Sequence, residues 1–342
     1  MNFISLYKLA ILVSIILLLT MFECGSGEHQ KVRIESGTEY MVGYESCLFF
    51  TPEVGLMGGE KEGNACLWKT NDGGRNWQIN RLKSGTVWDL TEKDGVAYAT
   101  VETREKDTLL YTHSVYTSSD QGENWQLKCE MVTKESFLNL LVVDDRRMFM
   151  VLSRSLLETR NGGKDWQMVR NDDCRKVSID DKYLYYKISN ILFRHGPFDY
   201  LVRRSLESGK EQLIRLSKGV CIKKICGDVV FLEKGQHMKF YQIEEDMSLT
   251  FLGQLKQQNY GVDYVDYMSR CGNQLFVYLS VGMAVKKLFY SPDGGVHWKY
   301  VDKGTWFGPT CMLADSTHVR MFILDPPLFL KSYIHERIWA DK

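Results

Sequence analysis

The chain has 342 residues, with 43 basic and 43 acidic side chains and no net charge at pH 7. This length exceeds one ordinary core of about 100–200 residues, unless the fold is a repeat or a large barrel. The charge balance argues against electrostatic binding of nucleic acid, and a hydrophobic content of 44% argues against a disordered chain.

Residues 1–27 have the pattern of an export signal. Lys8 precedes about 14 apolar residues, fewer than the roughly 20 that span a bilayer. Cys24 occupies the position of the lipidated cysteine in a bacterial lipoprotein signal, although Glu23 stands where that motif has a small residue. We expect export to the cell envelope or beyond, with lipidation at Cys24, simple cleavage and an uncleaved anchor all open. Residues 28–342 are expected to form a single domain.

Eight further cysteines lie in the rest of the chain: Cys47, Cys66, Cys129, Cys174, Cys221, Cys226, Cys271 and Cys311. An even number in an exported protein permits disulfides, and Cys47 could face Cys66 across a hairpin. Buried free thiols are an equally good interpretation. No CxxC pair and no histidine pair has metal-ligand spacing, so we predict neither a metal nor a cofactor.

Four segments share the pattern [Ser/Thr]-x-[Asp/Asn]-x-Gly-x-x-Trp, here called the turn motif. The Asp or Asn side chain at the third position of the motif can accept hydrogen bonds from the backbone of its own turn. Its glycine permits a positive φ, and its tryptophan supplies a large apolar surface for the core. The motif residues are Asp72, Gly74 and Trp77; Asp120, Gly122 and Trp125; Asn161, Gly163 and Trp166; and Asp293, Gly295 and Trp298.

The spacing of the turn motifs predicts a repeat. Their third positions lie 48, 41 and 132 residues apart, and the last spacing is three times 44. Degenerate copies centred on Glu207 and Asp246 fill that gap, and a seventh copy ends at Trp339. Between the motifs lie β-rich runs at Val96–Val101, Phe149–Leu152, Tyr183–Tyr186, Leu275–Leu279 and Met321–Leu324.

A period near 44 with four short strands in each unit is typical of a β-propeller. We therefore predict an all-β, seven-bladed β-propeller, with six or eight blades as alternatives. Residues 31–35 are expected to close the ring as an N-terminal strand. The glycine-rich segment 55–63 is expected to be a flexible loop between the second and third strands of the first unit.

The four intact motifs resemble the Asp-box (BNR) repeats of sialidases, sortilin-type receptors, some glucan hydrolases and photosystem II assembly-factor-like proteins. The resemblance covers nearly the whole chain after the signal segment, and it implies a fold more strongly than an activity. In those families the motif lies between the third and fourth strands of a blade, on the face away from the ligand site. The resemblance therefore implies a structural role for the motif residues and a binding site on the opposite face.

A sialidase-like glycoside hydrolase is the enzyme alternative. Sialidases share an early Arg-Ile-Pro and a clamp of three arginines, whereas Arg33-Ile34-Glu35 lacks the proline, and Arg204 and Arg270 are the remaining clamp candidates. Asp263 and Asp266 could flank a glycosidic bond, although exposed acids on a loop are usually only solvated. We assign no catalytic residue and favour a protein that is not an enzyme.

The connections expected on the opposite face combine aromatic and charged residues. Such residues are typical of protein interfaces and of surfaces on which sugars stack, although packing between blades is an alternative for each ring. We expect a monomer that binds a protein partner here, with a glycan as the alternative ligand and no nucleic acid. The candidate binding residues are Phe193, Arg194, His195, Phe198, Tyr200, Tyr260, Asp263, Tyr264, Trp306 and Phe307.

Overall fold

The computed structural model contains β-strands and turns in its described part. That part comprises residues 29–33, 42–51, 53–73, 76–105, 108–171, 174, 176–189, 198–235, 237–255, 262–271, 273–281, 285–303, 311–314, 318–325 and 333–340. Within these ranges, no helix is long or apolar enough to cross a membrane.

The described strands form seven antiparallel sheets of four strands, which follow one another along the chain. The first three sheets are β2 (Val42–Phe49), β3 (Gly55–Lys61), β4 (Asn64–Thr70) and β5 (Gln78–Ser84); β6 (Thr86–Lys93), β7 (Val96–Arg104), β8 (Tyr111–Ser118) and β9 (Gln126–Thr133); and β10 (Phe137–Val142), β11 (Met148–Leu152), β12 (Leu156–Thr159) and β13 (Gln167–Arg170).

The remaining four sheets follow the same order. They are β14 (Ser178–Ile179), β15 (Tyr183–Ser189), β16 (Asp199–Ser205) and β17 (Glu211–Arg215); β18 (Val220–Cys226), β19 (Val229–Lys234), β20 (His237–Ile243) and β21 (Leu249–Leu255); β22 (Val262–Cys271), β23 (Gln274–Val281), β24 (Val285–Ser291) and β25 (Lys299–Lys303); and β26 (Cys311–Ala314), β27 (His318–Asp325), β28 (Tyr333–Ala340) and β1 (His29–Arg33).

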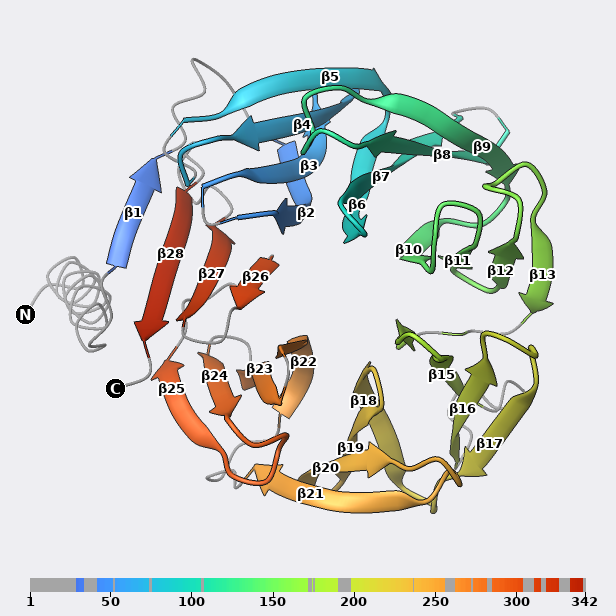
Figure 1. Cartoon of the computed structure of the whole chain (residues 1–342), viewed down its shortest axis with the longest axis vertical. Helices are drawn as coiled ribbons and strands as arrows, with labels where there is room; N and C mark the ends of the chain where they lie inside the picture. The colour runs from blue at the N-terminus through green and yellow to red at the C-terminus, as the bar shows by residue number, and fades with distance from the viewer. Residues whose placement is uncertain are drawn as a thin grey trace, which may run out of the picture.

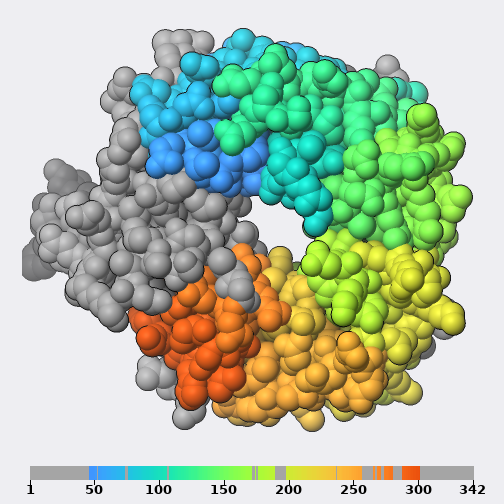
Figure 2. All heavy atoms as spheres, in the orientation of Figure 1, coloured from blue at the N-terminus to red at the C-terminus, as the bar shows by residue number. Residues whose placement is uncertain are grey.

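The sheets stand around a central opening (Figure 1). The first strand of a sheet lies nearest the opening and the fourth lies at the rim, as β2 and β5 show. The space-filling view shows that side chains leave this opening unfilled (Figure 2). The arrangement is all-β and propeller-like, as the repeat predicts.

The last sheet is completed by the N-terminal strand. β1 pairs with β28, with Lys31 opposite His335, so the rim strand begins at His29, two residues earlier than the sequence predicts. Since this fourth strand comes from the other end of the chain, no turn joins it to the third. The predicted seventh motif copy, which ends at Trp339, is therefore wrong, because its residues from Tyr333 onward belong to β28.

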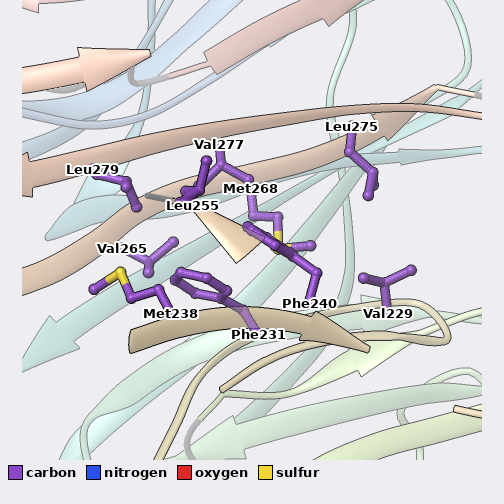
Figure 3. Close-up of a cluster of buried hydrophobic side chains, with 10 residues drawn as sticks. All are labelled: Val229, Phe231, Met238, Phe240, Leu255, Val265, Met268, Leu275, Val277 and Leu279. Carbon is purple, nitrogen blue, oxygen red and sulfur yellow. The ribbon is translucent and has the colours of Figure 1, made fainter. Parts of the chain in front are cut away.

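The β-rich runs of the sequence all lie in second strands, and those whose side chains the structure describes are buried between neighbouring sheets. Phe149 in β11, Tyr186 in β15 and Phe231 in β19 are fully buried. A strand covered on both faces is apolar throughout its length. Figure 3 shows one such interface, where Phe231 and Phe240 of the fifth sheet pack on Met268 and Val277 of the sixth.

The predicted flexible loop at residues 55–63 is wrong. Residues Gly55–Lys61 form β3 and are largely buried. A Cβ atom on Gly58 would lie 2.5 Å from Cγ1 of Val87 in the next sheet, so glycine here permits the two sheets to approach closely.

The possible disulfide between Cys47 and Cys66 is also contradicted. Cys47 is paired with Met57, and Cys66 with Gly59, so β3 separates the two thiols. Cys66 is free, as are Cys129, Cys221 and Cys226.

Candidate functional site: the central opening and the face opposite the turn motifs

Each intact turn motif connects the third strand of a sheet to the fourth. In the second motif the hydroxyl of Ser118 donates to Oδ1 of Asp120 at 2.7 Å, and the backbone N–H of Asn124 donates to the same oxygen at 2.9 Å. Asn124 Nδ2 donates to Oδ2 at 2.8 Å. Both carboxylate oxygens of Asp120 are thus engaged within the turn, and these hydrogen bonds hold the pKa of Asp120 below its usual range.

The other motifs repeat this arrangement with different partners. Asn161 replaces the acid in the third motif and donates through Nδ2 to Asp165 at 2.8 Å. In the fourth motif partial burial raises the pKa of Asp293, but hydrogen bonds from the His297 backbone and ring and from Ser291 outweigh it and lower the pKa to about 2. Gly74 of the first motif lies outside the described residues.

In the last three intact motifs the tryptophan packs its sheet against the preceding one. The ring of Trp298 stacks on Phe240 of the preceding sheet with 4.2 Å between centroids, and its Nε1 donates to the carbonyl of Gly295 at 2.7 Å. A Cβ atom on Gly163 would lie 2.3 Å from Sγ of Cys129, again in the preceding sheet. The motif residues thus contact mainly their own turn and its neighbouring sheet.

Because neighbouring strands are antiparallel, the connections divide between two faces. The turns between first and second strands share the face of the turn motifs, here called the motif face. The turns between second and third strands, and the connections from one sheet to the next, lie on the opposite face, here called the loop face.

Three inner strands carry a β-bulge that leaves one described side chain without a cross-strand partner residue. The bulge residue is Trp88 in β6, Leu138 in β10 and Lys223 in β18. A bulge redirects the side chain of the extra residue. Trp88 and Leu138 are 40% and 45% exposed, a high exposure for large apolar side chains on strands that border the opening.

The strands that carry Trp88 and Leu138, β6 and β10, are neighbours and are joined by a hydrogen bond. The backbone N–H of Leu140 donates to Oδ2 of Asp89 at 3.0 Å, as that of Leu90 donates to Ser46 of the first sheet. Burial raises the pKa of Asp89 to about 6, although hydrogen bonds from Leu140 and Leu90 oppose the shift. Oγ1 of Thr100, the cross-strand neighbour of Asp89, is buried without a hydrogen-bond partner among the described residues.

A buried histidine supports this region. His113 shows no solvent exposure, and its Nε2 lies 2.9 Å from the carbonyl oxygen of Glu135. Its Nδ1 lies 3.6 Å from Glu102, which accepts the N–H of Phe137 at 2.7 Å. Burial lowers the pKa of His113 and raises that of Glu102. Because both side chains hold the connection that leads to Leu138 and solvent does not reach His113, their geometry suits positioning rather than proton transfer to a ligand.

Two of the sequence-predicted binding residues are described with their side chains. Phe198 and Tyr200 lie where β16 begins, at the loop face, and the guanidinium carbon of Arg215 lies 3.7 Å from the centroid of the Phe198 ring. Asp263 and Tyr264 lie on the inner strand β22, with a register shift at Asp263. The others lie outside the described residues, as Cys24 does: Phe193, Arg194, His195, Tyr260, Trp306 and Phe307.

Neither Trp88 nor Leu138 is among the binding residues predicted from the sequence. One signal for Trp88 was present, since this tryptophan does not belong to a turn motif. Leu138 lies in an ordinary apolar run, and only the bulge in the register exposes it.

The clamp arginines considered for a sialidase-like site are not brought together. Arg33 ends the rim strand β1, whereas Arg204 pairs with Glu158 and Glu211 at 3.6 and 3.3 Å. Arg270 pairs with Asp228. The three arginines belong to three different sheets. In the part of the chain that the structure describes, no group of three or more potential metal ligands occurs.

Charge is distributed unequally between the two faces. The described turns of the motif face carry the acids Glu53, Asp72, Asp94, Asp120, Glu123, Asp144, Asp145, Asp165, Asp180, Asp181, Glu207, Asp228, Glu244, Glu245, Asp246 and Asp293. They carry fewer bases: Arg146, Arg147, Arg160, Lys164, Lys182 and Lys210. On the loop face the exposed described bases are Arg104, Lys134, Arg154, Lys176, Arg215, Lys218 and Lys234, against the exposed acids Glu62 and Glu105.

The comparisons with known proteins identify a fold. No family model matches the chain, and no curated protein matches it. The crystal structure of a puromycin hydrolase S511A mutant complexed with PGG is similar with a TM-score of 0.58 and 10% identity, over 87% of this chain and 53% of that one. A puromycin-hydrolyzing peptidase from Mycobacterium tuberculosis is similar with a TM-score of 0.55 and 10% identity, over 88% and 52%. The chain spans about half the length of these proteins, and the likeness supports a propeller-like fold.

Proposed function

We propose that this chain is an exported, seven-bladed Asp-box β-propeller that binds a protein partner on its loop face and catalyses no reaction. The turn motifs have a structural role in this proposal. The partner covers the loop-face end of the central opening, where Trp88 and Leu138 are exposed.

The exposure of Trp88 and Leu138 at neighbouring bulges carries the proposal. Large apolar side chains at the centre of a surface are typical of the residues that dominate protein interfaces. Phe198, stacked against Arg215, adds an aromatic and cationic pair on the same face. The motif face offers fewer groups to a partner, because each described motif acid accepts hydrogen bonds within its own turn.

The proposal disfavours hydrolysis. A sialidase-like clamp needs three arginines around one carboxylate, and the candidate arginines lie in separate sheets with acidic partners for two of them. A glycan remains the second candidate ligand, because exposed aromatic rings also stack on sugars.

Affinity capture with the full chain tests the proposal. The double variant Trp88→Ala/Leu138→Ala is compared with Met168→Ala/Leu213→Ala, which removes apolar side chains exposed by 59% and 62% from the rim strands β13 and β17. We expect the native chain and the rim variant to retain the same stoichiometric protein from an envelope extract, and the loop-face variant to lose it. Equal capture by all three chains would remove the loop face from the account. Release of the ligand by free sugar would instead support a glycan.

A further inference from the structure

Exposed basic side chains lie in the connections next to Trp88 and Leu138. Arg104 ends β7, Lys134 lies between β9 and β10, and Arg154 lies between β11 and β12. All three are exposed on the loop face of the second and third sheets. None of them has an ion-pair partner among the described residues.

The nearby acids offset this charge only in part. Both carboxylate oxygens of Glu135 are used within the loop, accepting from the Arg154 backbone at 2.7 Å and from Ser155 at 3.1 Å. Glu102 lies beneath the surface, and burial raises its pKa. Among the described residues of these connections, Glu105 is the one exposed acid, and it accepts a hydrogen bond from Thr108 at 2.6 Å. The surface around the two bulge residues is therefore basic.

One further apolar side chain is exposed at this surface. Leu109, in the loop between β7 and β8, has a φ of 56° and is 62% exposed. A leucine in the left-handed region is strained, and here the strained residue is exposed on the loop face. Trp88, Leu109 and Leu138 are thus exposed on the loop face of two adjacent sheets that also carry Arg104, Lys134 and Arg154.

We infer that the partner presents an acidic segment with a large apolar side chain to the loop face of the second and third sheets. The apolar side chain packs on Trp88 and Leu138, and the flanking carboxylates pair with Arg104, Lys134 and Arg154. This inference rests on the proposed function and names the chemistry of its partner. The acidic motif face would repel the same segment, so the charge distribution also selects which face binds.

A peptide-binding experiment tests the inference. The probe is a fluorescein-labelled peptide in which aspartate and glutamate flank a central Phe-Leu pair, and its binding to the full chain is followed by fluorescence anisotropy. One control peptide replaces Phe-Leu by Ser-Ser, and another replaces the acids by lysine. We expect the acidic apolar peptide to bind at least about tenfold more tightly than either control, and added salt to weaken binding.

Matched charge reversals then locate the contact. Arg104→Glu/Lys134→Glu/Arg154→Glu should weaken the acidic apolar peptide at least about tenfold, because three favourable interactions become repulsive. Lys164→Glu/Lys182→Glu/Lys210→Glu, which reverses exposed charges on the motif face, should change the affinity less than about twofold. Circular dichroism of each variant checks that the fold is retained.

Several results would overturn the inference. They are no binding of the acidic apolar peptide, equal binding of a control peptide, or an unchanged affinity after the loop-face reversal. If the chain captures a protein through Trp88 and Leu138 but ignores the loop-face reversal, the proposed function stands and the acidic partner does not. If capture is independent of Trp88 and Leu138, both fail.

Discussion

At the scale of single residues, the same motif position has different surroundings in different sheets. Nε1 of Trp125 and of Trp298 donates to the carbonyl of its motif glycine, at 3.1 and 2.7 Å. Nε1 of Trp166 is buried without a hydrogen-bond partner among the described residues. Packing is therefore common to these three tryptophans, and the hydrogen bond is not.

Replacement of tryptophan by phenylalanine separates the contribution of the indole hydrogen bond to stability from that of packing. Trp298→Phe should lose about 1 kcal/mol more stability than Trp166→Phe, because only Trp298 loses a hydrogen bond and leaves a carbonyl without its donor. Both variants lose some packing volume, so each is the control for the other. Urea unfolding measures the difference, and equal losses would show that the indole hydrogen bond contributes nothing.

The raised pKa of Asp89 leads us to expect that the stability of the fold depends on pH. Its folded pKa of about 6 lies above the ordinary value of 3.8, so its contribution to stability is fully present below pH 4 and is lost as the pH rises through 6. Asn at this position would keep an acceptor for the Leu140 N–H without a charge. The stability of Asp89→Asn relative to the native chain should therefore rise between pH 4 and 7, by about 2–3 kcal/mol. A pH-independent difference would contradict the buried-carboxylate account.

At the scale of elements, the turn motif packs one sheet on its neighbour. Gly163 has a φ of 92° and lies against Cys129 of the preceding sheet, whereas Gly95 has a φ of 79° and no atom within 4 Å of the place that a Cβ atom would take. The two glycines share the backbone requirement, and only Gly163 has the close contact.

Alanine at these two glycines isolates that contact. Gly95→Ala should cost about 1 kcal/mol through its backbone conformation alone. Gly163→Ala should cost a further 1–3 kcal/mol or so, because a methyl group would overlap Cys129. Thermal unfolding of both variants provides the comparison, and equal midpoints would mean that the sheets can separate slightly at no cost.

The sequence predicts the elements that obey a local rule. Five of the seven second strands were found because a strand buried on both faces is a continuous apolar run. The strand β3 was missed because Gly55, Gly58 and Gly59 resemble a loop, although Gly58 permits the close approach of the next sheet. The bulges at Trp88 and Leu138 were also missed, since a register shift depends on how two strands pair and leaves no mark in one strand's composition.

At the scale of the whole molecule, the two ends of the described chain meet in one sheet. Ladder hydrogen bonds alternate along an edge strand, so a proline at two successive positions must remove at least one bond between β1 and β28. Lys31→Pro/Val32→Pro should cost about 3 kcal/mol or more. Relative to the native chain, hydrogen exchange in this variant should accelerate more in β26, β27 and β28 than in β6–β9. Unchanged exchange in the last sheet would show that the N-terminal strand does not hold it.

Among the described residues the two faces also differ in charge: the motif face is acidic and the loop face is more basic, although the chain has no net charge. This distribution could not be predicted from composition, because it depends on which turns share a face. It follows from antiparallel pairing once the strands are assigned.

The most direct test of the proposed binding face uses a cysteine already present. Cys221 is the second residue of the inner strand β18, near the loop face, and is exposed and free. Its rate of alkylation by a maleimide is measured by mass spectrometry with and without the captured partner, beside a cysteine introduced on the motif face by Asp181→Cys. The account predicts that the partner slows alkylation of Cys221 at least about tenfold and leaves the motif-face cysteine unchanged. Protection of the motif-face cysteine with Cys221 still reactive would contradict it.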